Sequence, residues 1–388
     1  MKVLIVSGIW PPDVGGPASH GPELGRFLAE SGHEVRAVTA VGGRGAEPPG
    51  FPVRALSRET LMPLRLTTAA IAVASDARGH DVIYAAGGLY TRSLIASRLW
   101  SVPLVVKLTN DPAYERARAR GAFTGSLEDF QESHSGGLVR LLKRQRDLTM
   151  RRASRIIIPS RYLAKIAAGW GLPEERISVI PNPAPRAAPL ASREELRRRL
   201  GMDSPTFVFA GRFVIQKNLP LALAALQHAD GARLVLIGEG PEEDAVADEI
   251  ARRDLSDRVS MKGPMARATA VEWVRAADAA VLPSDWENFP HAVVEALAVG
   301  TPVIATAVGG VPEIIDNGVN GILVPPGDAR ALGEAMGSVA ADPDRTGRLR
   351  EGARRAAGRY SPERVYAAVE AELHHAIASS TRSRTASA

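Results

Sequence analysis

The sequence predicts an α/β fold with two open parallel sheets. The chain has 388 residues, of which 45% are hydrophobic, and this is enough apolar material for two cores. Short apolar runs rich in β-branched residues alternate with amphipathic stretches, as they do in parallel sheets with crossover helices. The alternation stops at residues 181–189 (PNPAPRAAP), because their four prolines cannot continue a helix or a central strand. It then restarts, so we expect a linker between two domains of similar size.

The apolar runs and the stretches between them define the expected elements in order. In the first half, strands are predicted at 3–7, 34–39, 53–56, 81–85, 103–107, 155–158 and 177–180, and helices at 17–31, 61–77, 90–100, 137–152 and 160–169. In the second half, strands are predicted at 206–210, 232–237, 258–262, 278–282, 302–305 and 321–324, and helices at 218–229, 241–253, 268–276, 289–299 and 328–341. A final helix is expected at 361–379, with His374 and His375 at its surface, and the tail from about 381 is expected to be disordered.

Composition excludes several classes of function. The chain has no cysteine, which excludes disulfide scaffolds, thiolate metal sites and thiol catalysis. It has no apolar run of about 18 residues that could span a membrane and no signal-peptide cleavage pattern, so we expect a soluble, cytoplasmic protein. The net charge of +5 is scattered along the chain without a nucleic-acid-binding motif, and we therefore expect no nucleic-acid partner.

Two glutamates, Glu287 and Glu295, give the strongest signal for a site. They lie in residues 283–304 (PSDWENFPHAVVEALAVGTPVI), with Glu287 in the loop after a strand and Glu295 just over one turn into the next helix. Pro290 suits the first turn of that helix, whose N-terminus offers unpaired N–H groups and a positive dipole end. Amides beside two carboxylates suit a ligand with both phosphate and hydroxyl groups, such as a sugar nucleotide. Carboxylates near a helix start are also common as caps, and this alternative remains open.

Two further pairs follow predicted strands, where ligands bind in open α/β sheets. Gly15 and Gly16 would allow a phosphate to approach the backbone, although a tight turn explains them equally well. Arg212 and Lys217 place two cations five residues apart at the carboxyl end of a strand, where a ligand site is expected. A solvated face is the alternative, but Lys217 is one of only six lysines among 48 basic residues. Since no credible metal-binding cluster is present, we expect neither a metal site nor a cofactor; Asp342 and Asp344 are interpreted as surface residues.

Several motifs in order resemble the family 4 retaining glycosyltransferases. Besides the E-x7-E segment they are PPDVGG (11–16), GHEV (32–35), VIPNP (179–183), AGRFVIQKNL (210–219), LVLIGEGP (234–241), VSMKGPM (259–265) and VGGVPEIIDNGVNGILVPPGD (308–328). The resemblance covers nearly the whole chain and implies the GT-B fold, with two Rossmann-like parallel-sheet domains facing a cleft. It implies an acceptor-side domain at 1–186, onto which the helix at 361–379 packs back, and a nucleotide-sugar-binding domain at 187–360.

The resemblance also assigns roles to the candidate residues. Arg212 and Lys217 would clamp the donor diphosphate, Glu295 would hold the ribose hydroxyls, and Glu287 would lie against the transferred sugar. Further donor contacts are expected from the amides of Gly15 and Gly16, the base-binding segment with Lys262 and Gly263, and Asn288, Phe289, His291, Ala292 and Val293. His291 is expected to replace the N–H that Pro290 lacks at a position where many members have glycine.

The segment KLTNDPAYERAR (107–118) departs from the family pattern. Many members have a histidine after the fourth strand, whereas this chain has Asn110 and Asp111 followed by Tyr114–Glu115, as in a bacterial subset. We expect Asp111 to line the sugar or acceptor site as a catalytic residue; the alternative is a turn-forming Asp-Pro. Residues 118–137 are expected to form a long, irregular acceptor loop.

The activity that the resemblance implies is retaining and metal-independent. The enzyme would move a hexose or N-acetylhexosamine from a nucleotide-diphosphate sugar, chiefly a UDP-sugar, to a hydroxyl acceptor. That acceptor could be a small natural product such as an aminocyclitol, or a lipid-linked or polysaccharide intermediate. The alternatives are a GT-B sugar-nucleotide epimerase and a nucleotide-sugar-binding protein without transferase activity.

Residues 138–155 raise the question of a membrane partner. They hold seven basic residues and one acidic residue, and a basic amphipathic helix can bind weakly to the anionic inner membrane surface. We favour the alternative, which is a solvated helix in an arginine-rich chain.

Overall fold

The chain folds into two compact units. The computed structural model describes residues 1–13, 16–42, 49–59, 61–133, 136–184 and 190–385. The first unit comprises Met1–Pro181 and Val365–Ala388, and the second comprises Asn182–Arg364. The predicted linker at 181–189 begins where the units divide, and its residues 185–189 lie outside the described residues.

A seven-stranded parallel sheet forms the centre of the first unit, in the order β3-β2-β1-β4-β5-β6-β7. The strands are β1 (Lys2–Ser7), β2 (Glu34–Val41), β3 (Val53–Ser57), β4 (Val82–Ala86), β5 (Leu104–Lys107), β6 (Arg155–Ile158) and β7 (Ile177–Val179). The helices are α1 (Gly16–Glu30), α2 (Met62–Ala77), α3 (Tyr90–Trp100), α4 (Pro112–Ala119), α5 (Leu127–Glu132), α6 (Gly137–Arg151) and α7 (Arg161–Ala168). All seven strands predicted for this half are therefore present.

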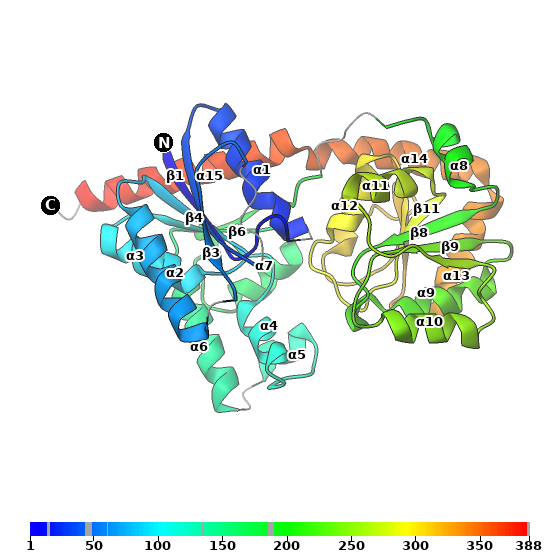
Figure 1. Cartoon of the computed structure of the whole chain (residues 1–388), viewed down its shortest axis with the longest axis horizontal. Helices are drawn as coiled ribbons and strands as arrows, with labels where there is room; N and C mark the ends of the chain where they lie inside the picture. Colours follow the sequence, from blue (N-terminus) through cyan, green and yellow to red (C-terminus); the bar gives the residue numbers. More distant parts are fainter. Residues whose placement is uncertain (14–15, 43–48, 60, 134–135, 185–189, 386–388) are drawn as a thin grey trace. The chain divides into compact units, whose positions relative to one another are not determined.

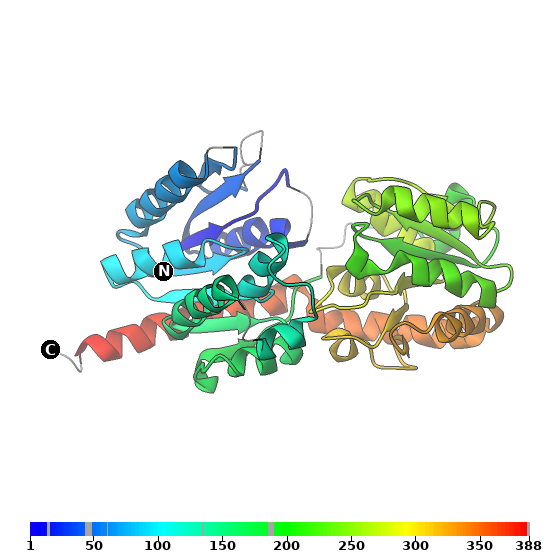
Figure 2. The same ribbon diagram turned by 90° about the horizontal axis from the view of Figure 1, so that it is seen from below.

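The last helix, α15 (Pro362–Thr385), completes the core of the first unit. Its residues Val365, Tyr366, Val369 and Leu373 are almost fully buried, and they share one core with β1 and α1. Their spacing is that of one helical face, which explains why this helix packs on the sheet rather than extending into solvent. α15 and α2 lie on opposite sides of the sheet (Figure 1, Figure 2).

The second unit has a six-stranded parallel sheet in the order β10-β9-β8-β11-β12-β13. Its strands are β8 (Thr206–Ala210), β9 (Arg233–Ile237), β10 (Val259–Met261), β11 (Ala279–Leu282), β12 (Val303–Thr306) and β13 (Gly321–Val324). Its helices are α8 (Arg193–Leu200), α9 (Leu219–Ala225), α10 (Glu243–Arg252), α11 (Arg267–Ala276), α12 (His291–Ala298), α13 (Ala329–Ala341) and α14 (Pro343–Ala357). Helices α8, α11, α12 and α14 cover one face of the sheet, and α9, α10 and α13 cover the other (Figure 1).

Several segments differ from the sequence-based prediction, and no helix was predicted where α4 and α14 lie. Residues 118–137, expected to be irregular, contain the end of α4 and all of α5, which begins with a capping box between Ser126 and Asp129. The helix α8 was not predicted, although Ser192 caps its first turn. The tail expected to be disordered from about 381 continues α15 as far as Thr385.

Candidate functional site

The strand order of the second sheet defines where a ligand site is expected. The chain runs outward from β8 to β9 and β10, and then from β11 to β12 and β13 in the other direction. The order therefore reverses between β8 and β11, which are neighbours in the sheet. Ligands of open α/β sheets bind at this kind of reversal, beside the carboxyl ends of the strands. The loops that follow β8 and β11 carry Arg212 and Lys217, and Glu287, respectively.

The side chains of Lys217 and Glu287 meet at this position in an ion pair. The Lys217 ammonium donates to Glu287 Oε1, and the Ser284 hydroxyl donates to the same oxygen over 2.8 Å. The Glu287 side chain is 7% exposed and that of Lys217 is 19% exposed. A charge-assisted contact with so little access to water is stronger than a surface ion pair. The pair therefore fixes one cation and one carboxylate at the reversal point of the sheet.

Hydrogen bonds between the two loops hold this pair in place. Gln216 Nε2 donates to the Trp286 carbonyl over 2.6 Å, and the Asp285 N–H donates to the Gln216 carbonyl over 2.9 Å. Asn218 Nδ2 donates to Asp285 Oδ1 over 2.7 Å. Because both loops are tied to each other, Lys217 and Glu287 are positioned before any ligand binds.

Three other predicted residues follow strands of the same sheet. Arg212 is exposed just after β8, and no ion pair of its guanidinium occurs within the described ranges. Lys262 is exposed after β10, with its ammonium 5.4 Å from the centre of the Trp273 ring. Gly263 has a φ of +66°, which favours glycine, and its carbonyl accepts from the Gly238 N–H over 3.0 Å.

The helix α12 begins one residue later than the first-turn position expected for Pro290. Pro290 is the N-cap residue, with extended backbone angles, and the first N–H groups of α12 belong to His291, Ala292 and Val293. Asn288 and Phe289 precede the helix and are buried, and the Phe289 carbonyl accepts from Asn182 Nδ2 over 3.2 Å. The helix thus offers amides and a positive dipole end close to Glu287.

Glu295 lies just over one turn into α12, as predicted, and forms an ion pair with Arg267 of α11 over 2.5 Å. Both side chains are partly exposed, so a ligand hydroxyl can compete for this carboxylate. A small hollow adjoins Glu295 and is lined mainly by apolar side chains. They include those of Ala210, Ala270, Val271, Leu282, Ala292 and Val293.

Comparisons with known proteins decide the family. A family model for glycosyl transferases group 1 matches residues 192–356, and one for a glycosyl transferase 4-like domain matches residues 15–183. The chain is 30% identical to D-inositol 3-phosphate glycosyltransferase of Xylanimonas cellulosilytica, in an alignment that covers 92% of this chain and 91% of that protein. The chain belongs to the family 4 glycosyltransferases.

Two further comparisons concern a curated relative and a solved structure. It is 30% identical to a glycogen synthase of Mycobacterium tuberculosis over 370 residues, covering 88% of this chain and 87% of that protein. The crystal structure of Anabaena HepE in complex with UDP and glucose superposes with a TM-score of 0.76, at 22% identity, over 96% of this chain and 99% of that chain. The fold is therefore GT-B, as the sequence predicts.

The first unit of the glycosyltransferase has its own reversal of strand order, between β1 and β4. Gly16 begins α1 after β1, whereas Gly15 lies outside the described residues. The loops after β1 and β4 touch at Gly8, where a Cβ atom would lie 2.2 Å from the Gly87 carbonyl oxygen. Only glycine at position 8 allows this approach of the two loops.

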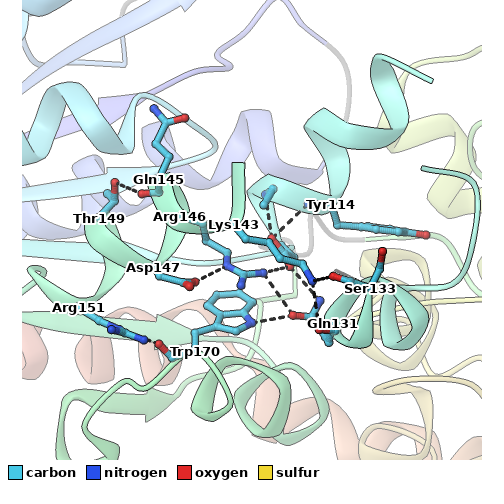
Figure 3. A network of polar contacts seen from close by, with 12 residues as sticks. Tyr114, Gln131, Ser133, Lys143, Gln145, Arg146, Asp147, Thr149, Arg151 and Trp170 are labelled. Atoms are coloured by element: carbon cyan, nitrogen blue, oxygen red, sulfur yellow. Dashed lines mark hydrogen bonds and ion pairs between the residues drawn. The ribbon is translucent and has the colours of Figure 1, made fainter. Parts of the chain in front are cut away.

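The structure places Asp111, which is fully buried, in the first unit. Its Oδ1 accepts from the N–H groups of Ala113 and Tyr114, and so caps α4. Its Oδ2 accepts from Gln131 and forms an ion pair with Arg146, whose guanidinium lies 4.0 Å from the centre of the Trp170 ring (Figure 3). Both oxygens are engaged inside the unit, so Asp111 connects α4, α5 and α6, and its expected catalytic role stays a prediction.

Sequence reasoning missed several groups that organise the site. The Ser284 hydroxyl orients Glu287, and a single serine after a strand gives no signal for this role. The contact between Gly8 and Gly87 has a clearer signal, because Gly87 and Gly88 follow a predicted strand directly. None of the helices in the described part of the chain has both the length and the apolar composition of a membrane span.

Proposed function

We propose that this glycosyltransferase transfers a hexose or N-acetylhexosamine from a UDP-sugar to a hydroxyl acceptor, with retention of configuration and without a metal or further cofactor. The second unit would bind the donor, and the first unit would bind the acceptor. The UDP-sugar is supported by the HepE complex, which contains UDP and glucose. The acceptor would be either a small natural product such as an aminocyclitol or a lipid-linked or polysaccharide intermediate. Assignment to the bacterial subset with the Asp-Pro and Tyr-Glu segment is part of the same proposal.

The observation that carries the proposal is the positioned Lys217 with Arg212 five residues before it. Negative charge builds on the nucleoside diphosphate as it leaves, and fixed cations stabilise that charge. A preorganised donor of this kind contributes roughly 10²–10³ in turnover. With two cations available, the reaction does not depend on a divalent ion for leaving-group stabilisation.

The neighbouring groups supply binding and orientation. Glu295 would exchange Arg267 for the ribose hydroxyls, and the base would lie along Lys262 and Gly263. The amides of Asn288, Phe289 and His291 would contact the transferred sugar beside Glu287. Ala292 and Val293 complete the part of the donor site that lies in the second unit, and Gly15 and Gly16 remain expected contacts of the donor phosphate.

The state of Glu287 bears on how retention would be achieved. A carboxylate that accepts from both an ammonium and a hydroxyl is a poor nucleophile, and this argues against a glycosyl-enzyme intermediate. In the proposed step the bond from the anomeric carbon to the phosphate oxygen breaks on the face where the acceptor oxygen bonds. The departing phosphate oxygen takes the acceptor proton, so no enzyme base is required.

Calorimetric titration with UDP, GDP, ADP and dTDP, in the presence of EDTA, tests the donor site. We expect UDP to bind to the full chain, and binding to weaken at least about tenfold in Arg212→Ala and Lys217→Ala. Arg252→Ala is the matched control, because Arg252 is an exposed arginine at the end of α10, on the opposite edge of the sheet. Binding that needs a divalent ion, or that is lost equally in Arg252→Ala, would contradict the diphosphate clamp.

The product of donor turnover tests retention and the epimerase alternative together. Proton NMR of UDP-glucose incubated with the protein should show slow release of α-glucose before it equilibrates with the β form. First appearance of β-glucose would overturn retention. An epimerised UDP-sugar would support the epimerase reading, and tight binding with no turnover in the presence of acceptors would support a binding protein.

A lipid-linked acceptor would fit a weak peripheral membrane contact through residues 138–155. We favour this contact less than a solvated helix. Of the seven basic side chains there, Arg146 and Arg155 form ion pairs within the first unit. Lys143 donates to the carbonyls of Gln131 and Ser133, and Arg151 donates to that of Trp170. These internal contacts favour a solvated helix.

A further inference from the structure

Three side chains with metal-binding chemistry meet in the first unit, away from the residues discussed so far. They are His33, in the turn between α1 and β2, and Glu370 and His374 of α15. One ligand atom from each lies within 4.8 Å of the other two. His33 Nε2 and Glu370 Oε1 are 2.5 Å apart, and the rings of His33 and His374 have centroids 5.6 Å apart.

The backbone on both sides of this group is fixed by the fold. Glu370 and His374 are four residues apart, so they project from the same face of α15. The helix is anchored by Val369 and Leu373, which are fully buried in the core of the unit. On the other side, the His33 N–H donates to the Leu28 carbonyl over 3.0 Å, and this bond closes the end of α1. The three ligands are therefore held by packing that does not depend on a metal.

We propose that His33, Glu370 and His374 form a binding site for a divalent transition-metal ion, with Zn²⁺ as the preferred ion. Two imidazole nitrogens and one carboxylate oxygen are ligands that Zn²⁺ accepts at about 2.0–2.2 Å. Tetrahedral ligands at that distance are about 3.3 Å from each other. The His33–Glu370 contact of 2.5 Å is shorter than this value and the other separations are no longer than 4.8 Å, so side-chain movements of less than about 2 Å complete the site. Water would take the fourth position.

Exposure and orientation suit the capture of an ion from solution. The side chains of His33 and Glu370 are 12% and 22% exposed, and His374 is exposed. The other ring nitrogen of His33, Nδ1, lies 3.3 Å from the Met1 nitrogen, so Nε2 is the atom that faces Glu370.

The position of this group in the fold suits a structural role rather than a catalytic one. His33 immediately precedes β2, so it lies at the amino edge of the sheet, whereas the glycine loop after β1 lies at the carboxyl edge. A bound ion would connect the end of α1 to α15, which follows it by more than 300 residues. Metal bound here would stabilise the return of α15 to the first unit, and it would do so independently of the metal-free donor chemistry proposed above.

Calorimetric titration of the untagged, chelator-stripped full chain with ZnCl₂ tests the proposal. We expect one Zn²⁺ per chain, and binding at least about tenfold weaker in His374→Ala and in Glu370→Gln. The matched control is His375→Ala, because His375 is the next residue on the same helix, is also exposed and is not in the group. This control should bind Zn²⁺ as the unaltered chain does.

Two further measurements make the outcome decisive. Zn²⁺ should raise the melting temperature of the unaltered chain and of His375→Ala but not that of His374→Ala, and circular dichroism without metal should be the same for all three. Co²⁺ should give the visible absorption of a tetrahedral site in the unaltered chain and in His375→Ala, but not in His374→Ala. Absence of stoichiometric binding, or equal loss in His375→Ala and His374→Ala, would overturn the site.

Discussion

The contact between Lys217 and Glu287 has two physical consequences at the scale of single residues. It holds a cation where the leaving group is expected, and it keeps a buried carboxylate paired. Removing one member of a buried pair leaves the other desolvated and unpartnered, which destabilises the fold. Effects on stability and on transfer must therefore be separated before Lys217 is assigned to leaving-group stabilisation.

A double substitution separates these effects. Lys217→Ala should lower the free energy of unfolding by roughly 1–3 kcal/mol, because Glu287 loses a charged partner. Adding Glu287→Gln should restore most of that stability, since a neutral amide is less costly to bury. Turnover should remain about 10²–10³ lower in both chains if Lys217 stabilises the leaving group. Urea unfolding and the rate of UDP release from UDP-glucose provide the two measurements.

The result has a clear alternative. If the double variant recovered turnover together with stability, Lys217 would serve only to neutralise Glu287. If the double variant stayed as unstable as Lys217→Ala, the destabilisation would not come from an unpaired Glu287.

Asp111 shows where sequence reasoning ends at this scale. Its position after a strand and before Pro112 can be seen in the sequence, and the turn-forming alternative agrees with the N-cap contacts that Asp111 makes. The partner Arg146 is 35 residues away on α6, and no local pattern identifies such a pairing. The same holds for Lys217 and Glu287, which are 70 residues apart: their strands were predicted, but their direct contact was not.

At the scale of elements, capping signals account for the helices that were not predicted. Asp111 with Pro112 begins α4, Ser126 with Asp129 begins α5, and Ser192 caps α8, which ends at Gly201 with a φ of +67°. These signals are present in the sequence. Apolar periodicity is weak in such short helices, so a reading that depends on periodicity misses them.

Helix α6 has an exposed face on which apolar and basic side chains lie together. Leu138, Leu141 and Leu148 are exposed, by 38%, 62% and 50% of their surfaces, and Arg140 and Arg144 are exposed beside them. This face resembles that of an interfacial helix, but several of its basic neighbours are used inside the unit. The net attraction to an anionic surface is correspondingly reduced.

We expect α6 to remain solvated. In a flotation assay at low salt, with vesicles containing an anionic lipid, the full chain should stay at the bottom of the gradient. Co-flotation that is lost in Arg140→Glu/Arg144→Glu and retained in Arg348→Glu, an exposed arginine of α14, would show instead that this face binds membranes. The peripheral contact would then become part of the function.

At the scale of the whole molecule, the sequence was most informative about architecture. Alternating apolar and amphipathic stretches predicted all thirteen strands of the described chain and the parallel sheets that they form. The order of the strands could not be predicted from the sequence, because it depends on which face of the sheet each crossover helix covers. That order creates the two reversal points, and so the position of the donor residues follows from topology as much as from motifs.

A buried lysine links the stability of the whole molecule to pH. Lys107 ends β5 and is 1% exposed, and its ammonium donates to the Ile180 carbonyl over 2.9 Å, just before the chain leaves the first unit. Burial lowers the pKa of Lys107 from its ordinary 10.5 to about 7. Between these two values the unfolded chain binds the proton that the folded chain releases. Stability contributed by this group therefore rises with pH from about 7 towards 10.5, and is lowest below pH 7.

Replacing Lys107 isolates that contribution. Between pH 7 and 9.5 the free energy of unfolding of the unaltered chain should rise relative to that of Lys107→Met, by up to about 1.4 kcal/mol per pH unit. Lys165→Met serves as the control, because Lys165 is an exposed lysine of α7 in the same unit, and it should follow the unaltered chain. Urea unfolding at each pH gives the difference directly, and groups common to both chains cancel in it. A constant difference across this range would mean that Lys107 stays charged in the folded protein, with the Ile180 carbonyl compensating for its burial.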